Sequence, residues 1–89
     1  MRCSVPILSR FFGITIAMFY QDHQPPHFHA RYGADEVLVE IDSGRVEGHM
    51  PRRALQMVLE WRTLHMAALR ANWQSCLSRE ALQPIPPLE

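Results

Sequence analysis

The sequence of 89 residues predicts one α+β domain, in which an antiparallel sheet of three or four strands precedes helical structure. Alternation between apolar and polar residues, which is typical of half-buried strands, runs through the first half of the chain and ends near His49. From Pro51 onward, apolar residues recur with the helical period of about 3.6 residues. Short connections between the strand segments favour antiparallel pairing of neighbours. The expected architecture is therefore a meander, followed by one kinked helix or by two helices packed on the sheet.

Four strand segments are expected in the first half of the chain: residues 13–20, 27–32, 36–41 and 45–49. The first is rich in β-branched and aromatic residues on both faces, which favours a central strand or one covered on both sides. The apolar residues before it lead to Gly13, which we expect to mark a bulge or a bend. Turn signals at Gly33-Ala34-Asp35 and Asp42-Ser43-Gly44 separate the later strands.

The helical region is expected to begin at Pro51, because proline is favoured at the first position of a helix. No glycine or proline interrupts residues 52–79, but a small domain buries more surface if the chain folds back near residues 63–66. Residues 1–6 are expected to form a loose leader. Residues 82–89 form a proline-rich tail that is either pinned to the body by its large apolar side chains or left for a partner. The predicted core consists of Ile14, Ile16, Phe28, Val37, Val39, Leu55, Val58 and Leu59.

The composition excludes several classes of protein. Nine arginines balance nine acidic residues, so the formal net charge of zero gives no overall attraction to nucleic acid. No apolar run reaches the roughly 18 residues of a membrane span. Cys3 and Cys76 belong to no motif, which favours a reducing compartment over a disulfide scaffold. We therefore expect a cytoplasmic protein.

The most distinctive stretch is Asp22-His23-Gln24-Pro25-Pro26-His27-Phe28-His29, which holds three of the five histidines. Its adjacent prolines predict a stiff turn or an extended loop over residues 22–26. Alternation in the strand that follows places two sets of side chains on opposite faces. Phe28, Ala30 and Tyr32 are expected to face the core, and His27, His29 and Arg31 are expected to form a row on the other face.

This row has several interpretations, and the plainest is a set of solvated side chains beside a turn. Histidines at alternate positions of a strand have Cα atoms about 7 Å apart, so both can reach one ion or one phosphate. A metal site would use His23, His27 and His29 for zinc or another divalent metal, with Asp22 or a distant residue as a further ligand. His27 and His29 could instead act as an acid and a base near neutral pH, or bind an anion together with Arg31.

Arg52 and Arg53 are a second candidate site for an anionic partner. They fall in the first turn of the predicted helix, where positive charge opposes the helix dipole. His49 precedes them and could extend the same patch. The plain alternative is a pair of solvated arginines.

Segments spread over nearly the whole chain from Ile7 onward are similar to those of a known family. They are Ser9-Arg10-Phe11-Phe12-Gly13, the run from Asp22 to His29, Pro51-Arg52-Arg53-Ala54-Leu55 with Trp61 and His65, and Pro87-Leu88-Glu89. With these residues the chain resembles the small prokaryotic family called domain of unknown function 4160. The resemblance implies a small protein partner encoded by a neighbouring gene, in a toxin–antitoxin-like pair, and it implies RNA chemistry.

Taken together, the leading interpretation is a small cytosolic interaction module without a cofactor. It would bind or cleave RNA through five side chains, His27, His29, Arg31, Arg52 and Arg53, with the two histidines as candidate catalytic groups. A module that binds zinc or another divalent metal, and a purely structural partner protein, are the alternatives.

Overall fold

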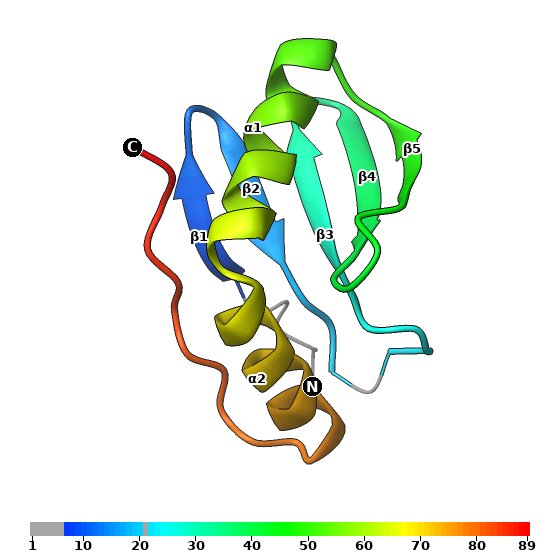
Figure 1. The fold of residues 1–89 in the computed structure, drawn as a ribbon, viewed down its shortest axis with the longest axis vertical. Helices are drawn as coiled ribbons and strands as arrows, with labels where there is room; N and C mark the ends of the chain where they lie inside the picture. Colours follow the sequence, from blue (N-terminus) through cyan, green and yellow to red (C-terminus); the bar gives the residue numbers. More distant parts are fainter. Residues whose placement is uncertain (1–6, 21) are drawn as a thin grey trace.

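The computed structural model describes residues 7–20 and 22–89, which form a five-stranded antiparallel sheet followed by two helices (Figure 1). The strands lie side by side in chain order: β1 (Ile7–Phe11), β2 (Ile14–Ala17), β3 (His27–Tyr32), β4 (Asp35–Glu40) and β5 (Val46–His49). Helices α1 (Arg52–Leu64) and α2 (Met66–Leu77) follow. The α+β class is confirmed, and the sheet has one strand more than the three or four predicted.

The extra strand is β1, which pairs with β2 in a hairpin. Phe11 pairs with Ile14, so the turn consists of Phe12 and Gly13 alone, with φ angles of +49° and +81°. Two consecutive positive φ angles are typical of the tight turns whose twist matches that of paired strands. The predicted strand at 13–20 is therefore wrong at both ends, because Gly13 reverses the chain and β2 ends at Ala17.

The core lies between one face of the sheet and the helices, and Trp61 is at its centre. Its ring packs against Phe11 and Phe28, with centroid separations of 5.7 and 5.6 Å. The predicted core residues of the sheet and Val58 are buried, whereas Leu55 and Leu59 are only partly buried at the margin of the core. Tyr32 was expected in the core and is 37% exposed, because its ring lies beside Gly13 in the hairpin turn.

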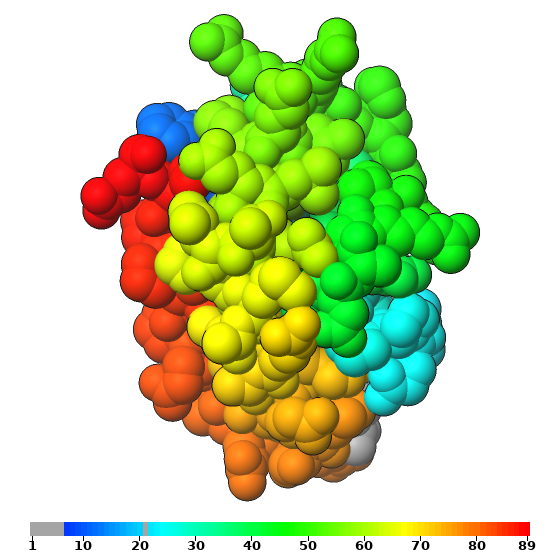
Figure 2. Space-filling view, viewed as in Figure 1, coloured from blue at the N-terminus to red at the C-terminus, as the bar shows by residue number. Residues whose placement is uncertain are grey.

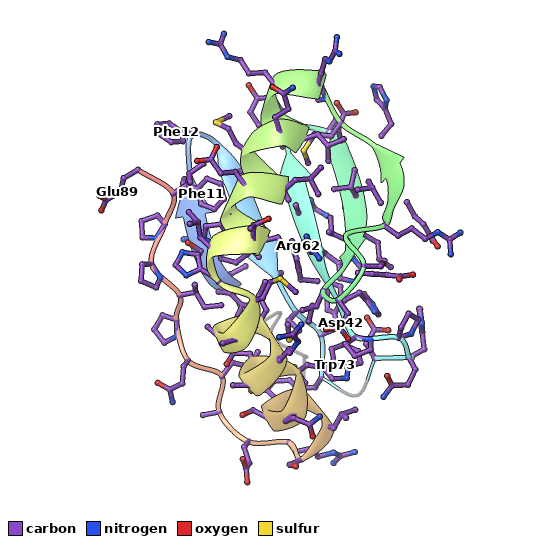
Figure 3. All side chains as sticks on the ribbon, in the orientation of Figure 1. Phe11, Phe12, Asp42, Arg62, Trp73 and Glu89 are labelled. Carbon is purple, nitrogen blue, oxygen red and sulfur yellow. The ribbon has the colours of Figure 1, made fainter. Side chains whose placement is uncertain are left out.

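The helical half follows the predicted boundaries. Helix α1 begins directly after Pro51, and His65 interrupts the helical backbone before α2, so the region forms two helices. Arg62 reaches from α1 to the turn between β4 and β5 (Figure 3), where it donates hydrogen bonds to the carbonyls of Ile41 and Asp42 at 2.8 and 2.9 Å. None of the helices in the described part of the chain is long and apolar enough to cross a membrane.

The proline-rich tail is pinned to the body, which was one of the two expected arrangements. In Figure 2 it covers one side of the helical face. Ile85 and Leu88 are buried, and the Ile85 N–H donates to the carbonyl of Leu8 on the outer edge of β1. Trp61 Nε1 donates to the carbonyl of Pro86 at 2.9 Å. The predicted leader and Cys3 fall outside the described residues.

Three leucines of the helices provide a graded test of this packing. Leu69 is fully buried, Leu59 is partly buried and Leu64 is 63% exposed. Leu69→Ala should lower the free energy of unfolding by about 2–5 kcal/mol, because it removes buried methyl groups and leaves a cavity. Leu64→Ala should change it by less than about 0.5 kcal/mol, and Leu59→Ala should fall between them. Urea denaturation measures all three, and equal losses would contradict the burial described.

Gly48 on β5 should not tolerate a side chain. Its φ is +106°, and a Cβ atom would lie 2.5 Å from the carbonyl oxygen of Glu36 on β4. Gly33 is a matched control, because its φ is also positive, +61°, but its Cβ position is open. Gly33→Ala should cost about 1–2 kcal/mol through backbone conformation alone. Thermal denaturation should show a clearly larger loss for Gly48→Ala, and the reverse order would argue against the β4–β5 pairing.

Candidate metal centre beside strand β3

Two histidine side chains of β3 meet one aspartate from the loop that connects β2 to β3. The rings of His27 and His29 have centroids 5.2 Å apart, and Asp22 Oδ2 lies between them. The loop end is fixed to the sheet, because the Ile41 N–H donates to the carbonyl of Pro26 at 3.0 Å. The prediction that His27 and His29 lie on the same side is confirmed by this contact.

His27 is the most enclosed member of the group, with 1% of its surface exposed. Its ring lies between the rings of Trp73 on α2 and His23 on the loop, at centroid distances of 5.2 and 4.9 Å. Nδ1 is 2.7 Å from the carbonyl oxygen of Pro25, which can only accept, so this nitrogen carries a proton and donates it. Nε2 faces Asp22 Oδ2 at 2.9 Å. The expectation that His27 is solvated is wrong, because the loop and α2 close over the start of β3.

His29 is partly exposed and lies between two carboxylates. Its Nε2 is 3.3 Å from Asp22 Oδ2, and its Nδ1 is 3.3 Å from Glu36 Oε2. The ring meets Phe19 edge-on, with centroids 4.4 Å apart. Glu36 also pairs with Arg31 through Oε1 at 3.2 Å. Acceptors on both sides therefore fix the orientation of the His29 ring.

Asp22 collects donors from three residues of its own loop and strand. Oδ1 accepts the backbone N–H of His23 at 2.8 Å, and Oδ2 faces both imidazoles. Burial by itself would raise the pKa of Asp22, but the His23 N–H and the His29 and His27 rings outweigh it and hold the pKa below 3.8. The group is therefore a carboxylate at neutral pH. The nearby Cys76 is buried, and burial, with a contribution from the Asp22 charge, raises the pKa of its thiol.

His23, the third predicted metal ligand, does not join the group. Its side chain is 72% exposed, Nδ1 donates to the carbonyl of Gln24 at 3.1 Å, and Nε2 is 3.7 Å from Asp22 Oδ1. The potential ligand atoms that converge belong to Asp22, His27 and His29, and they all lie within 4.8 Å of one another. Asp22, which the sequence analysis considered as a further ligand, therefore lies with His27 and His29, whereas His23 does not.

The structure keeps Arg31 in a row with His29, because Glu36 pairs with both, but it separates Arg52 and Arg53 from the histidines. Arg31 is exposed and paired with Glu36, two residues along β3 from His29. Arg52 and Arg53 are exposed at the start of α1, which lies at the other end of the sheet from the β2–β3 loop (Figure 1). A single surface that uses all five predicted side chains is therefore not formed.

The three site residues also fall within the part of the chain that matches a known family. A family model described as "Domain of unknown function (DUF4160)" matches residues 13–74, which run from the hairpin turn into α2. No curated protein and no solved structure matches the chain. Because the match spans well over half of the sequence, the chain belongs to the family described as "Domain of unknown function (DUF4160)".

Proposed function

We propose that this chain binds a divalent transition-metal ion through Asp22, His27 and His29. The supporting observation is the direction of the ring nitrogens. Both Nε2 atoms face the same oxygen of Asp22, while the Nδ1 atoms face acceptors outside the cluster, the Pro25 carbonyl and the Glu36 carboxylate. Histidines that bind metals usually donate their second N–H to a backbone carbonyl or a carboxylate, which fixes the tautomer and the ring.

The distances within the cluster suit a small ion. Metal–ligand bonds of about 2.0–2.1 Å in tetrahedral geometry place ligand atoms roughly 3.3 Å apart. His29 Nε2 lies at this distance from Asp22 Oδ2, at 3.3 Å, and His27 Nε2 is closer to the same oxygen, at 2.9 Å. All the potential ligand atoms lie within 4.8 Å of one another. Binding therefore needs side-chain shifts on the order of 1 Å. Asp22 and His29, each 18% exposed, are less enclosed than His27, so these shifts fall on them.

The donor set indicates the type of metal. Two imidazoles and one carboxylate suit zinc, iron(II), cobalt or nickel better than calcium or magnesium, which prefer oxygen ligands. Three protein ligands leave at least one position for water or a ligand, as in catalytic rather than structural zinc sites. Zinc is the simplest choice for a first test.

A metal-free cluster is the competing interpretation. In this interpretation hydrogen bonds alone hold the two imidazoles and the shared carboxylate together, with the Pro25 carbonyl and Glu36 as the outer partners of the rings. Such a cluster would attach the loop to β3 without any ligand. Added metal would neither bind to such a cluster nor stabilise it, so metal titration distinguishes the two interpretations.

Replacement of the more exposed ligand tests the metal site with little risk to folding. Zn²⁺ should bind metal-stripped protein, purified without an affinity tag, at one equivalent in calorimetry. His29→Gln should weaken binding by at least about tenfold, since even substitutions of residues that only hydrogen-bond to a metal ligand have such effects. His23→Gln is the matched control, because His23 belongs to the same loop but lies outside the cluster, and its affinity should stay unchanged. Equal effects of the two substitutions would argue against the proposed ligands.

Stability provides a second measurement of the same site. A ligand that binds only the folded state raises the melting temperature by mass action. Zn²⁺ should therefore raise the melting temperature of the wild type and of His23→Gln, and a chelator should reverse the increase. His29→Gln should show a clearly smaller increase at the same Zn²⁺ concentration. A wild type that is insensitive to both zinc and chelator would favour the metal-free cluster.

A second candidate function is that of one partner in a toxin–antitoxin-like pair. The outer edge of β5 is favourable for it, because in the described part of the chain no strand or tail pairs with that edge, whereas the tail bonds to the outer edge of β1. An open strand edge is a template for strand addition by a partner. RNA cleavage by His27 is less well supported, because its ring is buried.

Expression in a bacterial host tests this second candidate. The pair predicts that the chain alone slows growth and that the product of the neighbouring gene restores it. If Arg52 and Arg53 contact RNA, replacement of both by Gln should relieve the inhibition without lowering the melting temperature. Normal growth at full expression of the chain would contradict the toxin role.

A further inference from the structure

A second binding site follows from a row of side chains on the sheet face that the helices leave open. Arg10 of β1 pairs with Thr15 of β2, Thr15 pairs with Arg31 of β3, and Arg31 pairs with Glu36 of β4. Directly paired residues project to the same face, and neighbouring strands are about 4.8 Å apart. The Cα atoms of the two arginines are therefore roughly 10 Å apart, with a hydroxyl group between them.

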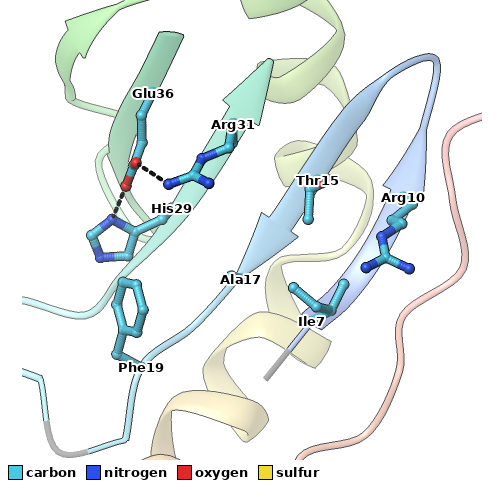
Figure 4. A pocket seen from close by; sticks show the side chains of 8 residues that line it. All are labelled: Ile7, Arg10, Thr15, Ala17, Phe19, His29, Arg31 and Glu36. Carbon is cyan, nitrogen blue, oxygen red and sulfur yellow. Dashed lines mark hydrogen bonds and ion pairs between the residues drawn. The ribbon is translucent and has the colours of Figure 1, made fainter. Parts of the chain in front are cut away.

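The open face is hollowed along this row (Figure 4). Strand β2 carries the small residues Thr15 and Ala17 here, whereas the strands on either side of it carry long side chains that form walls. The resulting cavity has a volume of about 340 Å³, and Ile7 and Phe19 contribute apolar surface to it. Cavities of about 300 Å³ and more accommodate small organic ligands.

The charges around the hollow favour an anion. The side chain of Arg10 forms no hydrogen bond or ion pair with any other described residue, whereas Arg31 shares its charge with Glu36. Arg10, Arg31 and Glu36 together carry a net charge of one positive unit. Guanidinium groups bind carboxylates through paired, charge-assisted hydrogen bonds, and the Thr15 hydroxyl can donate another.

We propose that this hollow binds a small monocarboxylate with a compact apolar body. One negative charge is balanced by the excess positive charge, and the apolar body contacts Ile7, Ala17 and Phe19. A phosphate monoester with two negative charges would leave one unbalanced. The site goes beyond the proposed metal centre, with which it shares His29 as a wall and Glu36 as the acceptor beside His29 Nδ1.

Titration with benzoate, followed by amide resonances in the presence of a chelator, tests this site independently of metal binding. Saturable shifts should be confined to residues around the hollow, such as Ile7, Thr15 and Ala17. Arg10→Gln should weaken binding by about tenfold, because it removes a charge-assisted contact. Arg45→Gln, which replaces an exposed arginine that does not line the hollow, should bind like the wild type. Both variants should keep the wild-type melting temperature, since both arginines are exposed.

Two further ligands make the outcome decisive. Benzyl alcohol should bind much more weakly than benzoate, and equal binding would show that the arginines do not recognise charge. Phenyl phosphate should also bind more weakly, and tighter binding would overturn the assignment of a carboxylate. Shifts that are scattered over the chain, or that do not saturate, would refute the site itself. Because the chelator is present throughout, failure of the zinc experiments leaves these results unaffected.

Discussion

The alternation of side chains along β3 is the constraint on which both the core and the candidate site depend. Phe28 and Ala30 are fully buried beneath the helices, whereas His29 and Arg31 project from the other face. A shift of the strand by one residue would exchange the two sets and place imidazole and guanidinium groups in the core. The burial of Phe28 against Trp61 therefore also fixes where the histidines point. Packing on one face determines the geometry of the site on the other.

Asp22 connects this strand to the loop before it, and its role in folding is compatible with metal binding. A buried imidazole must have partners for its nitrogens, since an unpaired polar group costs about 1–3 kcal/mol. His27 finds these partners in the Pro25 carbonyl and in Asp22. Metal ions compete with protons for the same lone pairs, so an ion would replace the protons shared between the rings and the carboxylate. The contacts that stabilise the loop thus also prepare the ligand geometry.

The sequence predicts those parts of the molecule that depend on local signals. The bounds of β3 and the start of α1 are correct because prolines precede both elements and because the alternation in β3 is clear. The strand β1 is missed because its turn uses Phe12 at a φ of +49°. Phenylalanine rarely adopts this conformation, so the sequence does not indicate a turn there. The burial of His27 depends on Trp73, which is distant in the sequence. The three side chains that converge, Asp22, His27 and His29, all belong to one sequence motif, but only the conformation of the loop shows that Asp22 joins the two rings and His23 does not.

The two proposed sites are connected through Glu36, and this connection has a physical consequence. Glu36 pairs with His29 through one oxygen and with Arg31 through the other. A carboxylate bound in the hollow would compete with Glu36 for Arg31. Glu36 would then pair with His29 alone. A stronger partner at Nδ1 makes the opposite nitrogen a better metal ligand. If both sites are occupied as proposed, each ligand should therefore increase the affinity for the other, because coupling between binding sites is reciprocal. The open face of the sheet would then act as one binding surface, built on a scaffold whose stability comes from the opposite face.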